Sequence, residues 1–232
     1  MKRAIKQRKQ KNNKTARKNK KSVLPTSVKP DFAVATLHHQ NGRTAEAAKI
    51  YQAILDADGD HTPSLNNLGM ILTGEGNNEQ AIALFSKAIA LNPDSARSHS
   101  SMAIALYQLG RLGDCLLSFR QSLAINPADE QTHFNLGNVL KEMGRPLEAI
   151  ASYREALRLN PGNFHAHTNM GAILLDQHNP QEAAACFRNV LALNPGIAEA
   201  HLNLGKALHN MGKLDQAEGA YRQALTIKPD YD

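Results

Sequence analysis

Apolar residues along this chain recur with a period of 34 positions. Frames starting at residues 28, 62, 96, 130, 164 and 198 divide it into six blocks without insertion or deletion, and we call the nth residue of a block slot n. Slot 7 is always apolar and holds Val34, Leu68, Met102, Leu136, Met170 and Leu204. Slot 8 is always small and holds Ala35, Gly69, Ala103, Gly137, Gly171 and Gly205. Apolar residues at slots 7, 10 or 11 and again at 20, 21, 24, 27 or 28 follow helical spacing, so each block is predicted to form two helices.

The second predicted helix of each block carries a small residue and an aromatic ring one turn apart. Slot 20 holds Ala47, Ala81, Cys115, Ala149, Ala183 and Ala217. Slot 24 holds Tyr51, Phe85, Phe119, Tyr153, Phe187 and Tyr221. Slot 32 holds Pro93, Pro127, Pro161, Pro195 and Pro229, with Gly59 in the first block. Every block therefore ends in a residue that breaks a helix.

Glycine separates the two helices in five of the six blocks. Slot 15 holds Gly42, Gly76, Gly110, Gly144 and Gly212, which suits the left-handed conformation that ends many helices. The fifth block has His178 there, followed by Asn179 and Pro180. Either His178 tolerates a positive φ, or that turn closes differently.

These blocks resemble tetratricopeptide repeats, through the small residues at slots 8 and 20, the aromatic at slot 24 and the proline at slot 32. The resemblance covers residues 28–231. It implies an all-α, right-handed superhelical solenoid of six tandem helix-turn-helix repeats. The repeats are 28–61, 62–95, 96–129, 130–163, 164–197 and 198–231. In this architecture the first helix of each pair lines a concave surface, with slots 2, 5, 6, 9, 12 and 13 toward the groove.

Slot 6 carries short polar side chains in five consecutive repeats, namely Asn67, Ser101, Asn135, Asn169 and Asn203. Asparagine is a poor helix former, because its amide competes with the backbone for hydrogen bonds. The same amide offers a donor and an acceptor to the backbone of an extended chain. We therefore predict a groove that binds a peptide or a protein segment, with Asn138 as a further groove residue. The alternative is that slot 6 merely tolerates exposure or bonds to the preceding loop.

Two further hypotheses concern what the repeats serve. The phrases LNNLG, FNLGN, TNMGA and LNLGK resemble the repeat region of protein O-linked N-acetylglucosamine transferases, which implies a substrate-selecting region whose enzyme would lie beyond Asp232 or on another chain. The helix around Ala217, Tyr221 and Leu225 has no following repeat to cover it, so it is expected to meet further repeats, a partner or a second copy.

Converging Lys and Arg are missing from slots 5 and 9, which disfavours a groove for peptides that are bound through their C-terminal carboxylates.

No pattern points to catalysis, a cofactor or a small-molecule substrate, and motifs such as GxxxxGK[ST], GxSxG and HExxH are absent from the sequence. We predict a non-enzymatic protein without a metal. Slot 4 holds His99, His133, His167 and His201, but equivalent atoms of successive repeats lie about 10 Å apart, too far for one ion. Packing is the expected role of these histidines. Cys115 and Cys186 are expected to be buried and inert.

Charge is concentrated at the N-terminus. The chain of 232 residues has a formal charge of +6, yet residues 22–232 carry 16 basic and 21 acidic groups. Residues 1–21 contain no acid and eleven cations: Lys2, Arg3, Lys6, Arg8, Lys9, Lys11, Lys14, Arg17, Lys18, Lys20 and Lys21. A disordered basic tail is therefore predicted over residues 1–27. No apolar run approaches the length of a bilayer span and no secretory signal is apparent, so a cytoplasmic location is expected.

The basic tail is expected to contact nucleic acid or anionic membranes weakly, to act as a nuclear address, or only to aid solubility or dock on the acidic repeats. A chain that starts at Ser22 should lose affinity for RNA, DNA and anionic vesicles, because the repeats carry a net negative charge. Filter binding and vesicle sedimentation at low salt would measure this loss. Retained binding would move the site into the repeats.

Overall fold

The computed structural model describes residues 31–230, which form twelve α-helices in six consecutive pairs. The predicted basic tail of residues 1–27 lies outside this part of the chain. The helices are α2 (Phe32–Gln40), α3 (Thr44–Ala57), α4 (Thr62–Gly74), α5 (Asn78–Leu91), α6 (Ala96–Gln108), α7 (Leu112–Ile125), α8 (Glu130–Glu142), α9 (Pro146–Leu159), α10 (Phe164–Asp176), α11 (Pro180–Leu193), α12 (Ala198–Asn210) and α13 (Leu214–Ile227). The predicted all-α architecture of paired helices is confirmed.

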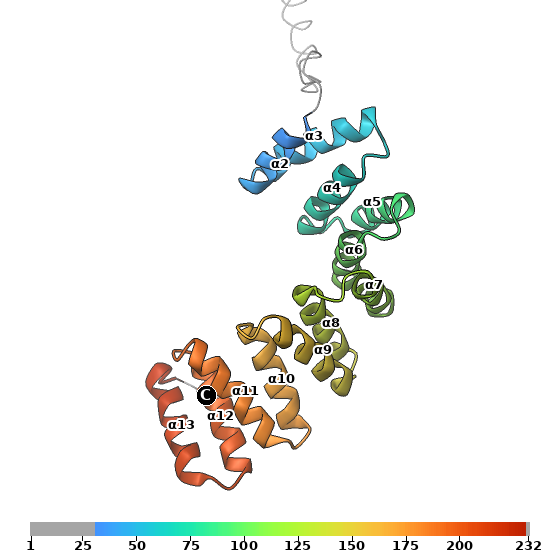
Figure 1. Ribbon diagram of the computed structural model, residues 1–232. Helices are drawn as coiled ribbons and strands as arrows, with labels where there is room; N and C mark the ends of the chain where they lie inside the picture. Colours follow the sequence, from blue (N-terminus) through green and yellow to red (C-terminus); the bar gives the residue numbers. More distant parts are fainter. Residues whose placement is uncertain (1–30, 231–232) are drawn as a thin grey trace, which may run out of the picture.

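The pairs stack into an arc that runs from α2 and α3 to α12 and α13, with α4, α6 and α8 along its inner side (Figure 1). Each helix packs mainly against the helices before and after it in the sequence. This is the arrangement expected of a solenoid, in which a repeat contacts only its neighbours. None of the helices in residues 31–230 combines the length and apolar character needed to cross a bilayer.

Local side chains define where most of the first helices begin. Ser95, Asp129 and Asn163 precede α6, α8 and α10, and each side chain accepts a hydrogen bond from the N–H three residues on. Such caps satisfy one of the free N–H groups at a helix start. Ile197 precedes α12 and provides no such bond.

The turn after each first helix closes through a residue with positive φ. The five slot-15 glycines have φ between 68° and 79°, and His178 has φ 55°. The His178 and Asn179 N–H groups bond to the carbonyls of Leu175 and Leu174, which matches the bonds that Gly144 and Arg145 make after α8. The first of the two alternatives for His178 is therefore correct. Because histidine has a Cβ, it adopts this conformation less readily than glycine does.

The slot-24 aromatic is the centre of each repeat. Tyr51, Phe85, Phe119, Tyr153 and Phe187 are all fully buried. Four slot-8 glycines lie against the ring of their own repeat, so that an added Cβ would overlap Phe85, Tyr153, Phe187 or Tyr221. Alanine takes this place in the first and third repeats, as Ala35 and Ala103.

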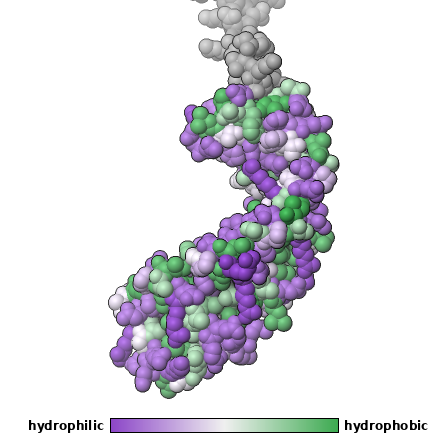
Figure 2. Space-filling view, in the orientation of Figure 1, coloured by the Kyte–Doolittle hydropathy of each residue, from purple (hydrophilic) through white to green (hydrophobic). Residues whose placement is uncertain are grey.

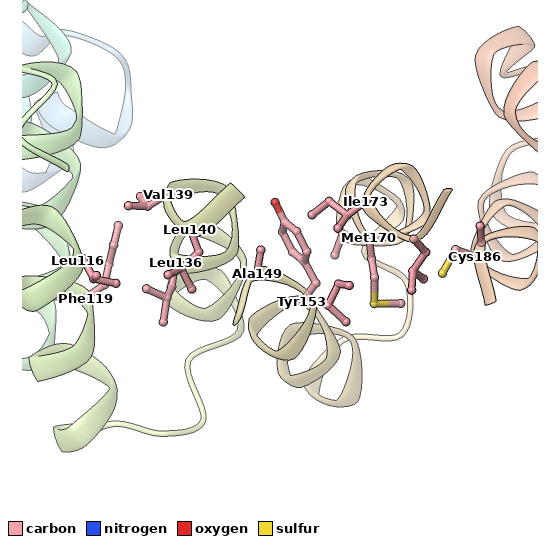
Figure 3. Close-up of a cluster of buried hydrophobic side chains, with 14 of the residues drawn as sticks. Leu116, Phe119, Leu136, Val139, Leu140, Ala149, Tyr153, Met170, Ile173 and Cys186 are labelled. Carbon is pink, nitrogen blue, oxygen red and sulfur yellow. The ribbon is translucent and has the colours of Figure 1, made fainter. Parts of the chain in front are cut away.

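A continuous apolar core passes from one repeat to the next. One cluster of buried residues extends from Ala103 to Ala207, and smaller clusters lie at both ends. In Figure 3 the Tyr153 ring stands between Leu140 of its own repeat and Ile173 of the following one. At the C-terminal end, the sequence predicted that the helix around Ala217 would be uncovered. Ala217 itself is buried, because it packs within its own helix pair against Leu208.

The slot-4 histidines join each repeat to the loop before it. The Nε2 atoms of His99, His133, His167 and His201 lie 2.9–3.1 Å from the carbonyl oxygens of Pro93, Pro127, Pro161 and Pro195, respectively. The imidazole therefore donates a hydrogen bond to a carbonyl that ends the preceding repeat. His167 is the most deeply buried of the four, and its Nδ1 has no hydrogen-bond partner within residues 31–230. This burial lowers the pKa of His167, with the bond to Pro161 acting in the opposite direction.

Replacing Gly137 with alanine should destabilise the fold. Alanine normally stabilises a helix by about 0.5–1 kcal/mol relative to glycine. Here the new Cβ would lie 2.6 Å from a Tyr153 ring carbon, so we expect a net loss of about 1–3 kcal/mol in the free energy of unfolding. Gly219→Ala is the matched control, because its Cβ meets no atom within 4 Å, and it should gain stability. Urea titrations followed by circular dichroism would measure both, and a gain in both variants would contradict the role given to Gly137.

His167 should make stability fall on acidification. Because its folded pKa is lowered, the unfolded chain binds the proton more readily, so stability is present above about pH 6.5 and is lost as the pH drops toward the folded pKa. His167→Gln should therefore lose less stability than the wild type between neutral and mildly acidic pH. His133→Gln is the control, since His133 makes the same type of bond at a more exposed position. Equal acid sensitivity in His167→Gln and the wild type would exclude this contribution.

Candidate functional site

Two pockets open between successive first helices on the inner side of the arc. The central pocket, between α6 and α8, has a volume of about 560 Å³, and the C-terminal pocket, between α10 and α12, one of about 360 Å³. The central pocket is lined by Ile104, Tyr107, Phe119, Asn135, Asn138, Val139, Lys141 and Glu142. The C-terminal pocket is lined by Ala172, Leu175, Asp176, Asn203, Lys206 and Asn210. Most of these residues occupy slots 6, 9, 12 and 13, which the resemblance to tetratricopeptide repeats assigns to the groove.

The space-filling view shows this inner side as a hollow between the two ends of the arc (Figure 2). Hydrophilic surface is the more extensive along it, with smaller hydrophobic areas between.

Asn67 is only 7% exposed and forms hydrogen bonds between repeats. Its Nδ2 donates to the Tyr51 hydroxyl at 3.1 Å, and its Oδ1 accepts from Arg97 at 2.9 Å. Both functions of the amide are therefore used inside the protein. Asn67 is thus neither exposed nor bonded to the preceding loop, because its partners are side chains of the repeats before and after its own.

Asn169 belongs to a similar hydrogen-bond network beside Tyr153. Its Nδ2 donates to the Asn138 Oδ1 at 2.9 Å, and its Oδ1 lies 3.4 Å from Lys141 Nζ. The Asn138 Oδ1 also accepts from the Tyr153 hydroxyl at 2.7 Å. Burial raises the pKa of Tyr153, so this hydroxyl stays protonated and available as a donor.

Asn135 and Asn203 differ from these two residues. The Asn135 Oδ1 accepts from Gln131 at 3.0 Å, but its Nδ2 has no hydrogen-bond partner within residues 31–230. The amide of Asn203 has no partner in the same part of the chain. Asn135 lines the central pocket and Asn203 the C-terminal pocket. Ser101, the remaining slot-6 residue, is largely buried.

This division coincides with the aromatic at slot 24 of the preceding repeat, although the side chain of Asn169 itself bonds to Asn138 and Lys141. Tyr51 precedes Asn67 and Tyr153 precedes Asn169, so a hydroxyl is available to the amide or to its neighbour Asn138. Phe119 precedes Asn135 and Phe187 precedes Asn203, and a phenyl ring offers no hydrogen bond. The alternation of Tyr and Phe is visible in the sequence. Comparing slot 24 of each repeat with slot 6 of the next would have pointed to Asn135 and Asn203.

The central pocket combines an apolar wall with charge at its rim. Ile104, Phe119 and Val139 provide the apolar surface, and Lys141 and Glu142 carry opposite charges. The Glu142 carboxylate accepts a hydrogen bond from the Tyr107 hydroxyl, and this bond is the main reason that the pKa of Tyr107 is raised. Cation and anion nearly balance here, so the pocket does not favour a highly charged ligand.

Neither cysteine is placed to act as a nucleophile. Cys115 and Cys186 are buried, free thiols. Burial raises the pKa of Cys115 to about 12 and that of Cys186 to about 11, so both remain protonated at neutral pH. Within residues 31–230, no cluster of three or more His, Cys, Asp or Glu residues is arranged to bind a metal ion.

Comparison with known proteins identifies the repeat. Residues 131–163 and 168–232 match tetratricopeptide repeat family models, and residues 69–110 match a TPR repeat model. No curated protein matches the sequence.

Solved structures with the same fold include YrrB, PilF from Pseudomonas aeruginosa and MamA. YrrB, a TPR protein described as having an unusual peptide-binding site, is 21% identical with a TM-score of 0.72, over 79% of this chain and 95% of its own. PilF is 19% identical with a TM-score of 0.73, over 86% and 90% of the two chains. MamA is 19% identical with a TM-score of 0.68, over 75% and 97%. These structures share the fold of the chain, and the repeat matches, which together span more than half of the sequence, show that the chain belongs to the tetratricopeptide-repeat proteins.

Proposed function

We propose that the protein is a non-catalytic scaffold whose concave groove binds an extended peptide or protein segment. The observation that carries this proposal is that the Asn135 Nδ2 and the amide of Asn203 line pockets and have no hydrogen-bond partner within the described residues. A polar group without a partner in a partly enclosed site is a ready contact for a ligand. The peptide-binding site of YrrB, which shares this fold, is consistent with such a use of the groove.

The chemistry of the central pocket suggests how a peptide would lie. The acceptor oxygens of Asn135 and Asn138 are occupied by Gln131, Tyr153 and Asn169, whereas neither Nδ2 atom has a partner within residues 31–230. Both asparagines therefore offer N–H donors, which backbone carbonyl oxygens of an extended chain would accept. The apolar wall of Ile104, Phe119 and Val139 would then receive an apolar side chain between these contacts.

The series of available amides proposed for this groove is thus narrower than the slot-6 pattern alone suggests. Asn135, Asn138 and Asn203 are its members, and Asn67 and Asn169 serve the fold. The closer resemblance to the repeat region of O-linked N-acetylglucosamine transferases stays a prediction from the sequence phrases. A substrate-selecting role beside such an enzyme would use the same groove.

The test begins with peptides selected by the wild-type protein from a random display library. The double variant Asn135→Ala and Asn203→Ala should bind the selected peptides about 5- to 150-fold more weakly, because each lost hydrogen bond contributes about 0.5–1.5 kcal/mol. Its free energy of unfolding should change little, since neither Nδ2 atom is bonded within the described part of the fold. Fluorescence anisotropy and urea unfolding would measure the two quantities.

Asn67→Ala is the matched control and should behave in the opposite way. It leaves the Tyr51 hydroxyl and Arg97 without their partner, so the fold should lose about 1–3 kcal/mol while peptide affinity is retained. Unchanged peptide binding in the double variant would contradict the proposed role of the two amides. Failure to select any peptide would contradict the groove function itself.

A further inference from the structure

The first helix pair exposes a surface that every later repeat buries. In the interior, slots 7 and 10 of the first helix pack against the preceding repeat, so that Leu68 is 5% and Ile71 4% exposed. The equivalent residues of α2, Val34 and Leu37, are 43% and 55% exposed. The α2 face therefore has the composition of an inter-repeat contact without a neighbour to cover it among the described residues.

The last helix pair exposes the other half of the same contact. Tyr51 and Tyr153 are fully buried at slot 24, whereas Tyr221 of α13 is only partly buried. Leu225, at slot 28, is 49% exposed. The two ends of the described chain thus carry the two sides of one interface, which is formed five times inside the protein.

Ion pairs align neighbouring repeats at this interface. Arg120 on α7 pairs with Glu148 on α9 at 3.1 Å, and Arg154 on α9 pairs with Glu182 on α11 at 2.7 Å. Both pairs join slot 25 of one repeat to slot 19 of the next. Glu148 is held from the other side by Arg145, three residues before it, at 2.7 Å.

The same residues stand at the two ends of the described array. Slot 25 of the last repeat is Arg222, and slot 19 of the first is Glu46, preceded at slot 16 by Arg43 as Glu148 is by Arg145. Within residues 31–230 the Arg222 guanidinium pairs only with Glu218 of its own helix, at 2.7 Å, and both side chains are exposed. Arg222 would face Glu46 if the array continued from α13 into the first repeat of another copy.

We propose that the α13 face of one copy packs against α2 and α3 of a second copy, with Arg222 pairing to Glu46, so that the repeat array continues from chain to chain. This contact is separate from the groove and goes beyond peptide binding. Because it joins two different surfaces, each added copy presents a new free face, and association proceeds to rods instead of stopping at a dimer.

The full chain should be studied by sedimentation velocity over about a hundredfold range of concentration, where the average mass should rise past that of a dimer. Arg222→Glu should weaken association about tenfold, because the new carboxylate would face Glu46. Glu46→Arg should weaken it similarly. The double variant with both changes should restore association, since the pair is rebuilt with the charges exchanged.

Arg188→Glu is the matched control, because Arg188 is an exposed slot-25 residue whose counterpart in the next repeat is the neutral Gln216. It should leave association unchanged. Leu37→Asp tests the apolar part, and should abolish association while circular dichroism shows an intact fold, since Leu37 is exposed in the single chain. A monomer at every concentration would overturn the proposal. Association that is unchanged in Arg222→Glu would overturn it too, as would a double variant whose association is not restored. These outcomes do not depend on whether the groove binds peptides.

Discussion

The structure depends on one packing constraint: a pair of helices cannot bury its own aromatic ring. The ring at slot 24 fills the space between the two helices of its repeat, and a glycine or alanine at slot 8 lets it approach the helix backbone. Its far side is covered by the first helix of the next repeat, as Tyr153 shows beside Ile173 (Figure 3). Each repeat is therefore complete only with a neighbour, and stability spreads along the array through local contacts.

The architecture could be predicted from the sequence because its determinants repeat. A ring and a small residue in all six blocks, with a terminal proline in five, leave few alternatives to paired helices. Even the exception at His178 forms the same turn with a positive φ. Individual hydrogen bonds were harder to predict. The histidines bind carbonyls six residues earlier, and those atoms come within reach only once the loop geometry is known.

In the groove, too, individual hydrogen bonds could not be predicted from the sequence. Slot 6 identifies which residues face the inner side, but availability depends on what each amide already contacts. Asn67 reaches a hydroxyl 16 residues away and an arginine 30 residues away, so its neighbours in sequence say little about it. Asn138 was predicted as a groove residue, yet its oxygen accepts two internal bonds while its Nδ2 has no partner within residues 31–230.

The tyrosine or phenylalanine at slot 24 lies behind the groove, on the second helix, and still affects which amide atoms are open to a ligand. The phenolic oxygen of Tyr51 accepts a hydrogen bond from Asn67, and that of Tyr153 donates one to Asn138, whereas Phe119 and Phe187 offer no such bond to Asn135 or Asn203. Substitutions in the hidden layer could therefore move binding positions from repeat to repeat while the residues that touch the ligand stay the same. In such an array, specificity can evolve from the inside of the protein outward.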